Sequence, residues 1–567
     1  MASADAAATS YLWEPTYPDG IDWRAPIDRY PLNRVMDEAA AQFADRPCAD
    51  FMDKVWTYGQ IGDLVDRFAA GLQALGVVKG KRVGLFLPNC PYYPIAYFAI
   101  LKCGGIVVNF NPLYAEREIR HQIDDSGIEL MVTLDLKVLH DKLLPVLGST
   151  SLKRLIICPM AKLLPWPKSW LFPIAKRNDI AAIPRDESHV RFATVTSHGA
   201  KPSPVEVGID DLAVLQYTGG TTGVPKGAML SHGNLSANVS QCKLWFQGAK
   251  PGREVMLGVL PFFHVFAMTV VMNMAVRMGA SIIMLPRFEL PALIKAIDRK
   301  KPTLFPAVPT IYTAINHYHG LDKVDLSSLA MCFSGGAPLP MEVKQHFEEL
   351  TGCSLVEGYG LSETAPVTNG NPLFGVNKAG SIGPPVPGTV VKIISLEDRE
   401  TEVPQGERGE VCISGPQVMS GYWNNEEETD HALVDGLLHT GDVGYLDEDG
   451  YVFIVDRIKD LIVCSGFNVY PRNVEEAIYE HGAIQECIVA GVPDEYRGQT
   501  VKAYIRLKDG TSLNKAELLA FLKDKLSPIE MPKHVEFRKQ PQPKTLIGKL
   551  DRKAIVEEEM RAAAAQG

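Results

Sequence analysis

A glycine-rich segment near the middle of the chain carries the residue types that bind phosphate. It reads Tyr217-Thr-Gly-Gly-Thr-Thr-Gly-Val-Pro-Lys-Gly227. Glycines let backbone N–H groups approach an anion, threonine hydroxyls add donors, and the lysine supplies a positive charge. An apolar strand at 212–217 and a helix start at 231–236 are predicted around it, as in phosphate-binding loops. The candidate phosphate-binding residues are Thr218, Gly219, Gly220, Thr221, Thr222, Gly223 and Lys226.

This segment differs from the common nucleotide-binding loops. The P-loop requires Gly-Lys-Ser/Thr, whereas here Pro225 precedes Lys226 and Gly227 follows it. A kinase loop is excluded because neither Val-Ala-Ile-Lys nor Asp-Phe-Gly accompanies the glycines. Taken alone, the segment leaves a structural turn open, because glycine serves freely in turns.

Five further motifs follow the glycine-rich segment in order. They are Glu357-Gly-Tyr-Gly-Leu-Ser-Glu-Thr, His439-Thr-Gly-Asp442, Asp456-Arg-Ile-Lys-Asp460, Ser465-Gly-Phe-Asn-Val-Tyr-Pro471 and Lys544-Thr-Leu-Ile-Gly-Lys549. In order and spacing the six motifs resemble the adenylate-forming superfamily. Within it, the chain is similar to the bacterial long-chain fatty acid–CoA ligases, from about Trp56 to Lys549.

The resemblance implies a reaction in two steps. A medium- to long-chain fatty acid is first activated by ATP as an acyl-adenylate. The acyl group is then transferred to CoA, and AMP and pyrophosphate are released. ATP, Mg²⁺ and the co-substrate CoA are therefore expected, with a small carboxylic acid as the substrate.

The same resemblance assigns roles to residues outside the glycine-rich segment. Tyr359 would stack on adenine, Ser362 replaces the family's usual threonine, and Asp442 and Arg457 would bind ribose. Gly466 would lie beside the pantetheine tunnel. The nucleotide- and CoA-binding residues carried over in this way are Gly335, Gly336, Ala337, Tyr359, Gly360, Ser362, Asp442, Arg457 and Gly466.

Three residues are expected to act in catalysis. Glu363 would hold Mg²⁺, since a carboxylate is an oxygen ligand for a hard cation. Lys549 would stabilise the charge that builds on the α-phosphate during adenylation. Lys459, two places after the ribose arginine, would be the hinge about which a small domain rotates between the two steps.

The acyl-binding segment is expected at 261–268, Pro-Phe-Phe-His-Val-Phe-Ala-Met. Phe263, His264 and Gly336 are the candidate substrate-binding residues. No acidic residue stands in the segment to bind an amino acid's ammonium group. Two alternatives stay open: a ligase for medium-chain, pimelate-like dicarboxylates, and a fatty acyl-AMP ligase that loads a carrier protein.

Alternation of short apolar runs with longer amphipathic stretches predicts an α/β fold. Residues 82–87 and 105–110 are expected as strands, with a helix at 93–104. Residues 375–456 form a hairpin-rich region. The resemblance implies two packed α/β subdomains and a small β-barrel in an N-terminal domain at 1–456, a hinge at 457–459 and a mobile α+β C-terminal domain at 460–567.

Net charge and composition limit the kinds of partner that the chain can bind. A net charge of −10 leaves no general basic field for a nucleic-acid backbone. The ten cysteines are scattered, without a Cys-x-x-Cys pair or a His cluster at metal-ligand spacing, and are expected as buried thiols. The first ten residues lack the features of a signal peptide, which predicts a cytoplasmic protein. The family also allows a homodimer.

Two segments raise the question of a membrane. Residues 255–276 are nearly all apolar, and about 20 such residues cross a bilayer, but Pro261 interrupts them and favours two buried elements. Residues 159–178 mix two tryptophans with cations and prolines. They leave open either an aromatic cover over the core or peripheral contact with the inner face of a membrane.

Overall fold

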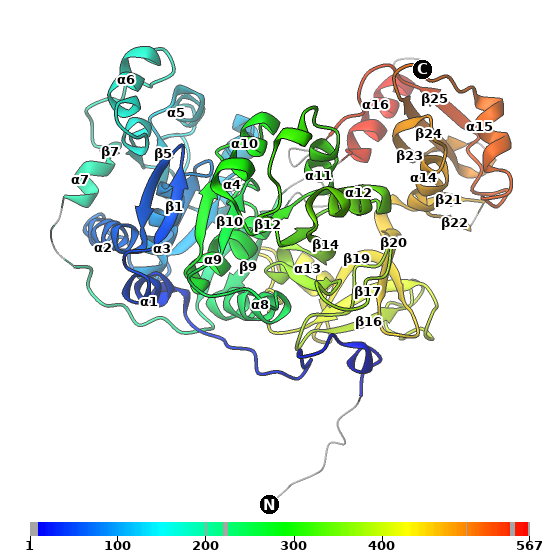
Figure 1. The fold of residues 1–567 in the computed structure, drawn as a ribbon, viewed down its shortest axis with the longest axis horizontal. Helices are drawn as coiled ribbons and strands as arrows, with labels where there is room; N and C mark the ends of the chain where they lie inside the picture. Colours follow the sequence, from blue (N-terminus) through cyan, green and yellow to red (C-terminus); the bar gives the residue numbers. More distant parts are fainter. Residues whose placement is uncertain are drawn as a thin grey trace, which may run out of the picture. The chain divides into compact units, whose positions relative to one another are not determined.

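A computed structural model describes residues 10–197, 199, 201–218, 225–465, 467–494, 496–544 and 550–564 (Figure 1). The chain forms two compact units. The first comprises Met1–Val391, Ile413–Leu438 and Asp449–Tyr451, and the second comprises Lys392–Cys412, His439–Glu448 and Val452–Gly567.

A seven-stranded sheet lies in the first unit. Its order is β7-β6-β5-β3-β4-β8-β9, and every neighbouring pair is parallel except β8 and β9. In that order the strands are His189–Arg191, Arg154–Cys158, Leu130–Leu134, Arg82–Phe86, Ile106–Asn109, Leu212–Thr218 and Lys226–Ser231. The strands predicted at 82–87 and 105–110 are β3 and β4.

The first unit also contains an eight-stranded sheet. Its order is β15-β14-β13-β12-β10-β11-β1-β2, with parallel pairing inside and antiparallel pairing at both edges. In that order the strands are Val367–Gly370, Ser354–Gly360, Met331–Ser334, Leu304–Ala307, Val255–Gly258, Ser281–Met284, Pro47–Phe51 and Lys54–Thr57. Parallel sheets of this kind confirm the predicted α/β fold class.

Most helices of the first unit connect parallel strands of one of the two sheets (Figure 1). In chain order they are α1 (Val35–Gln42), α2 (Tyr58–Ala74), α3 (Tyr92–Lys102), α4 (Glu116–Ser126), α5 (Lys137–Leu143), α6 (Lys168–Ala175), α7 (Phe192–Thr196), α8 (His232–Trp245), α9 (Met274–Met278), α10 (Leu290–Lys300), α11 (Pro309–Asn316), α12 (Met341–Thr351) and α13 (Glu426–Ala432).

Helices α3 and α8 are buried on nearly all sides. Every residue of α3 except the last is buried, which suits a helix that is apolar all round. Helix α8 is also buried but carries amides, which bond to backbone carbonyls. Asn238 Nδ2 donates to Val367 O at 2.7 Å, and Gln241 Nε2 donates to Pro387 O at 2.9 Å. Partners of this kind remove the cost of burying an amide.

The apolar stretch 255–276 folds as two buried elements, as predicted. Strand β10 ends at Gly258, and a π-helical segment, Ala267–Asn273, follows the proline and runs into α9. All seven residues of the π-helical segment are buried. Within the described residues, no helix combines the length and apolarity that a bilayer crossing requires.

The region 375–456 contains a five-stranded sheet. Its order is β16-β17-β19-β18, with β20 also paired to β19. The strands β16 to β20 are Val390–Ile394, Gly409–Ser414, Leu433–Val434, Leu437–Leu446 and Val452–Arg457. Antiparallel pairing of β19 with β18 and with β20 confirms the predicted hairpins.

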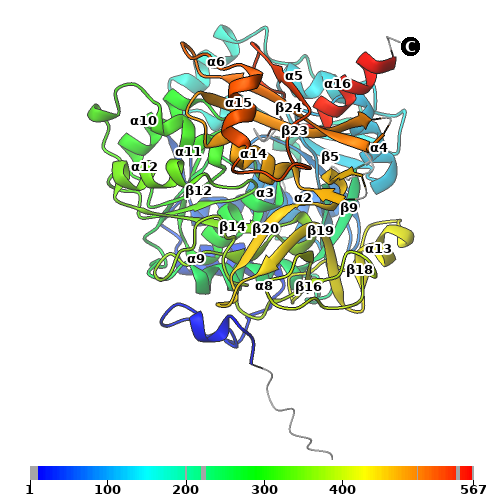
Figure 2. The same ribbon diagram turned by 90° about the vertical axis from the view of Figure 1, so that its right-hand side faces the viewer.

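The C-terminal part of the second unit is an α+β fold (Figure 2). Its sheet has the order β22-β21-β24-β23, and β25 pairs with β24. One face packs Val501 against Val474 of α14 and Leu518 of α15, and the other packs Tyr504 against Ile555 of α16. The strands β21 to β25 are Ile462–Cys464, Phe467–Val469, Ile484–Asp494, Gly498–Leu507 and His534–Phe537, and helices α14 to α16 are Pro471–Tyr479, Lys515–Leu522 and Arg552–Ala564.

Candidate active site

The structure describes the two ends of the glycine-rich segment. Thr218 ends β8 and Lys226 begins β9, and the two residues are paired across the hairpin. Residues 219–224 of the loop between them lie outside the described residues, so five of the predicted phosphate-binding residues stay predictions. These are Gly219, Gly220, Thr221, Thr222 and Gly223.

The strand predicted at 212–217 and the helix start predicted at 231–236 are confirmed as β8 and α8, which begins at His232. The sequence prediction missed β9, so the glycine-rich segment joins two antiparallel strands and does not lead directly into the helix. The first turn of α8 is already satisfied, since Ser231 Oγ accepts the N–H of Asn234 at 3.0 Å and Asn234 Oδ1 accepts that of Ser231 at 2.9 Å. A phosphate bound by this segment would therefore be held by the β8–β9 hairpin and not by the first turn of α8.

Lys226 lies beside an acidic and an aromatic side chain of the same unit. Its Nζ is 2.5 Å from Glu428 Oε2 on α13 and 5.4 Å from the centre of the Tyr422 ring. The lysine side chain is only 11% exposed. Strand β9 holds the segment that carries Tyr422, because Trp423 N donates to Gly227 O at 2.8 Å.

Glu363 is brought to the same tyrosine from a different part of the chain. It lies in a short 3₁₀ turn, Ser362–Thr364, after β14. Tyr422 Oη donates to Glu363 Oε1 at 2.8 Å. Burial raises the pKa of Tyr422 above its ordinary value, and the Glu363 charge raises it further. Tyr422 therefore stays protonated and donates a hydrogen bond to Glu363, while its ring lies beside Lys226. The sequence prediction missed this tyrosine.

The predicted adenine-binding residues follow two adjacent parallel strands. Gly335, Gly336 and Ala337 come directly after β13, while Tyr359 and Gly360 end β14. Because β13 and β14 are parallel neighbours, their carboxyl ends meet at one edge of the sheet. Glycine is required at the end of β14, since a Cβ on Gly360 would lie 2.1 Å from Pro366 O.

The predicted acyl segment contacts this adenine loop. A Cβ placed on Gly335 would lie 3.1 Å from the Phe266 ring, so the two segments are in direct packing contact. Phe263 and His264 are half-buried in the turn before Phe266. The His264 Nδ1 atom accepts the N–H of Phe266 at 3.3 Å.

Buried side chains hold the turn 261–264 through its backbone. Asn89 Nδ2 donates to Leu260 O at 2.7 Å, and Asn89 Oδ1 accepts the N–H of Phe262 at 2.7 Å. Gln216 of β8 donates to Phe263 O at 3.0 Å. Strand β8, which leads to the glycine-rich loop, thus also fixes the turn that presents His264.

In the second unit, the predicted ribose-binding pair is in contact. Asp442 and Arg457 face each other across β19 and β20, with Arg457 Nε 3.0 Å from Asp442 Oδ1. Asp442 is buried, whereas half of the Arg457 side chain is exposed. A carboxylate positioned by an arginine in this way can accept hydrogen bonds from hydroxyl donors.

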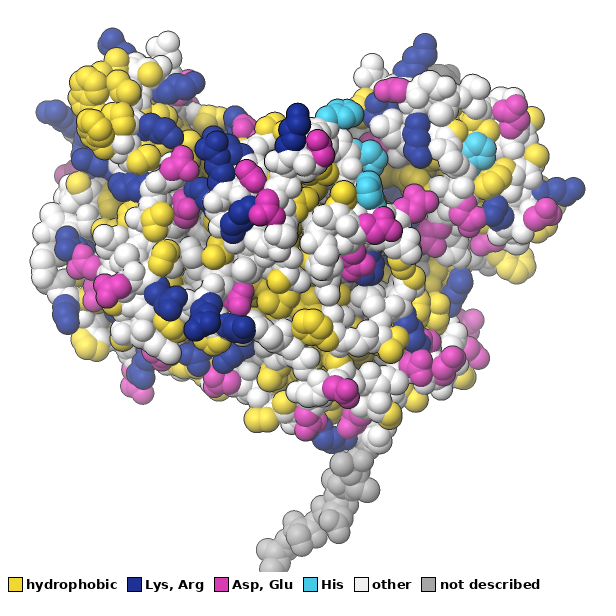
Figure 3. All heavy atoms as spheres, in the orientation of Figure 1, with side chains coloured by type: hydrophobic (Ala, Val, Ile, Leu, Met, Phe, Trp, Pro, Cys, Tyr) yellow, Lys and Arg dark blue, Asp and Glu magenta, His cyan; other side chains and the backbone are white. Residues whose placement is uncertain are grey.

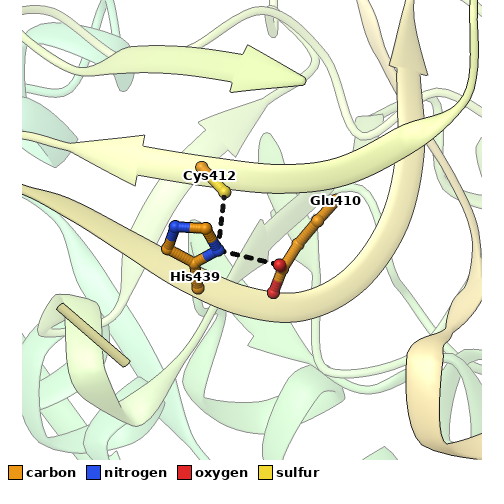
Figure 4. A group of neighbouring side chains, drawn as sticks. All are labelled: Glu410, Cys412 and His439. Carbon is orange, nitrogen blue, oxygen red and sulfur yellow. Dashed lines mark hydrogen bonds and ion pairs between the residues drawn. The ribbon is translucent and has the colours of Figure 1, made fainter. Parts of the chain in front are cut away.

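A buried group of three side chains fixes the turn before Asp442 (Figure 4). His439 Nδ1 lies 2.8 Å from Glu410 Oε2 and 3.4 Å from Cys412 Sγ, and Gly441 N donates to Glu410 Oε1 at 2.9 Å. Their ligand atoms lie within 4.8 Å of one another, a spacing that could hold a metal ion. Burial raises the pKa of the Cys412 thiol. The sequence prediction missed this group, because strand pairing joins residues far apart in the chain.

The predicted hinge lies in a 3₁₀ turn, Ile458–Asp460, in which Lys459 is exposed. Arg552 joins both flanks of this turn. Its guanidinium lies 2.8 Å from Asp460, 2.9 Å from Glu475 and 3.6 Å from Asp456. Arg552 follows shortly after Lys549, which lies outside the described residues together with Gly466.

The ten cysteines are all buried and free, as predicted.

Comparisons with known proteins agree with the motif order. The family model described as AMP-binding enzyme matches residues 36–423, and the AMP-binding enzyme C-terminal domain matches 473–549. The chain is 45% identical to the long-chain-fatty-acid–CoA ligase of Bacillus subtilis (strain 168) over 551 residues, which covers 96% of this chain and 98% of that protein.

Two solved structures extend the likeness to the fold. ATP-bound MatB from Rhodopseudomonas palustris matches with a TM-score of 0.79 at 27% identity, over 93% of this chain and 98% of that one. The anthranilate CoA ligase AuaEII in complex with anthranoyl-AMP matches with a TM-score of 0.81 at 25% identity, over 95% of this chain and 99% of that one.

Proposed function

Because this chain belongs to the AMP-binding enzyme family of adenylate-forming ligases, we propose that it activates medium- to long-chain fatty acids with ATP and transfers them to CoA. The observation that carries the choice of substrate is the 45% identity, over nearly both full lengths, to a long-chain-fatty-acid–CoA ligase. The apolar segment 261–268 beside the adenine loop supports it.

The donor set of the first unit fits a magnesium-bound triphosphate. Lys226 supplies a positive charge and Glu363 a carboxylate oxygen, and Tyr422 links the two. The buried Ser334 Oγ, at the edge where the adenine loop begins, has no hydrogen-bond partner among the described residues. Glu363 would hold Mg²⁺, which would screen the phosphate charges from the attacking carboxylate when bound.

The proposed chemistry divides between two sets of residues. In the first step the fatty acid carboxylate attacks the α-phosphorus, the bond to pyrophosphate breaks, and Lys549 stabilises the charge on the phosphoryl oxygens. In the second step the CoA thiolate attacks the acyl carbonyl and AMP leaves with the former carboxylate oxygen. Lys549 has no role in that step. Rotation about the hinge at 457–459 would replace the residues used for adenylation by those used for acyl transfer to CoA.

The proposal places the chain in the cytoplasm, with peripheral contact between 159–178 and the inner face of a membrane. A domain boundary at 456 and a homodimer stay predictions.

A chain-length series of mono- and dicarboxylic acids tests the substrate. AMP and acyl-CoA should form together, in equal amounts and fastest with medium- to long-chain monocarboxylates. Each added methylene contributes about 0.8 kcal/mol in an apolar tunnel. Faster turnover of dicarboxylates, or AMP formation without acyl-CoA, would contradict the proposal.

A further inference from the structure

Helix α6 exposes an unusual amount of apolar surface. None of its residues is buried. The exposed fractions on the helix are 67% for Trp170, 64% for Ile174 and 45% for Leu171, and Trp166, two residues before the helix, is 84% exposed. We call these four side chains the α6 face. Figure 3 shows hydrophobic side chains gathered at the upper left, where Figure 1 places α6, with Lys and Arg side chains around them.

The α6 face is an apolar stripe on a firmly attached element. Trp170 and Ile174 are spaced four residues apart on α6, which places them one above the other on the helix, and Trp166 lies just before the helix begins. The segment is attached to the core by the buried Leu163 and Leu164 and by the partly buried Phe172. The exposure of the stripe therefore does not result from a detached helix.

The charge around the α6 face is positive. Residues 159–178 contain four cations and no acidic residue, although the whole chain has a net charge of −10. The Lys168 and Lys176 side chains are 58% and 60% exposed, and their nearest carboxylates, on Asp53 and Asp179, lie at 3.5 and 3.3 Å. Exposed pairs of this kind contribute little and leave the cations able to bind other anions.

We infer that the α6 face docks the protein onto an anionic lipid bilayer. Tryptophans prefer the headgroup level of a membrane, while leucine and isoleucine enter the acyl boundary. The surrounding lysines and arginine would bind the phosphates of acidic lipids. A second protein copy could cover the apolar stripe, but the positive charge favours a surface of anionic lipid. Docking would hold the enzyme where fatty acids partition.

Vesicle binding by the full-length protein tests this inference without ATP, CoA or fatty acid, so its failure is separate from any failure of the ligase reaction. The wild type should co-sediment with phosphatidylcholine vesicles that contain phosphatidylglycerol, and its tryptophan emission should shift to the blue. The variant Trp170→Asp/Ile174→Asp should bind such vesicles at least about tenfold more weakly. The matched control Val78→Asp/Val376→Asp changes two side chains of similar exposure, 63% and 62%, and should bind like the wild type.

Acid-dependent ATP–pyrophosphate exchange with a dispersed medium-chain acid should be unchanged in both variants and shows that they are folded. Added salt should weaken wild-type binding. Equal binding by the wild type and Trp170→Asp/Ile174→Asp overturns the inference, as does equal binding to vesicles with and without phosphatidylglycerol. The inference is also wrong if the wild type binds no vesicles and the Trp170→Asp/Ile174→Asp variant has a lower mass in solution than the wild type. In that case the α6 face joins two copies of the chain.

Discussion

At the scale of single residues, Tyr422 is the unexpected member of the candidate site. Its ring lies beside Lys226, and its hydroxyl donates to Glu363. A carboxylate that accepts a hydrogen bond from a partly buried phenol keeps a fixed orientation. The tyrosine would therefore set the direction in which Glu363 presents its other oxygen to a metal ion.

Tyr422→Phe should remove that hydrogen bond and leave the ring in place. Hydrogen bonds to charged groups contribute about 1.5–3 kcal/mol, so we expect at least about a tenfold higher Mg²⁺ requirement in ATP–pyrophosphate exchange. Tyr451→Phe is the matched control, since its hydroxyl donates to the backbone oxygen of Val376 at 2.7 Å. An unchanged Mg²⁺ dependence in Tyr422→Phe would exclude this role for the hydroxyl.

Lys549 is predicted to act only in adenylation. Lys549→Ala should lower acid-dependent ATP–pyrophosphate exchange by about 10² or more, the effect of losing one preorganised electrostatic donor. Acyl transfer from a supplied acyl-adenylate to CoA should be retained. Lys553→Ala, in which an exposed lysine of α16 is removed, should leave both steps unchanged. Exchange at the wild-type rate in Lys549→Ala would refute the assignment.

Candidate site residues could be named from the sequence where a motif is contiguous. The contact between Asp442 and Arg457 agrees with the ribose pair expected from two short motifs. Tyr422 lies 59 residues from Glu363, and Arg552 lies 92 residues from Asp460, so only the folded chain shows these contacts. Nothing in the local sequence distinguishes such a tyrosine or arginine from an ordinary core or surface residue.

At the scale of elements, the sequence predicted the apolar strands but not the hairpin of β8 and β9. The run 226–231 is short and partly apolar, and periodicity alone does not separate a short strand from the start of a helix. Helix α8 carries buried amides that fit no amphipathic pattern, because their partners are backbone carbonyls of distant segments. The start of α8 was predicted at 231–236, but only tertiary contacts explain the strand before it and the burial of its amides.

Helix α8 begins with a buried histidine, from which we expect the first unit to lose stability in acid. His232 Nδ1 accepts the N–H of Leu32 at 3.1 Å, and burial lowers the pKa of His232 to about 4. An unfolded histidine has a pKa of about 6.5, so the stabilising contribution is complete above that pH and falls as pH drops toward 4. At about pH 5 the loss is about 2 kcal/mol.

His232→Asn should remove this pH dependence while an amide oxygen still accepts the Leu32 N–H. We expect the variant to be less stable than the wild type at neutral pH and to lose less stability between about pH 7 and pH 5, as measured by thermal unfolding. His317→Asn, in which an exposed histidine is changed, is the control and should follow the wild type. Parallel losses in His232→Asn and the wild type would show that His232 does not cause the dependence.

At the scale of the whole molecule, the chain forms two units, and the predicted functional residues divide between them. Lys226 and Glu363 belong to the first unit, while Asp442 and Lys459 belong to the second. An enzyme with two chemically different steps can use a different set of residues for each step if a small domain rotates about a hinge. Lys459 lies inside the second unit, in a short 3₁₀ turn between β20 and β21, and its role as a hinge stays a prediction.

Lys459→Pro should separate the two half-reactions. Proline fixes φ at about −65°, so rotation at this residue is lost, while the residues that bind ATP and the fatty acid are unchanged. Adenylate formation, measured by ATP–pyrophosphate exchange, should stay near the wild-type rate, whereas acyl-CoA release should be blocked. Lys459→Ala removes the charge but keeps backbone freedom and should support both steps. Equal loss of both half-reactions in Lys459→Pro would mean that residue 459 does not act as a hinge between them.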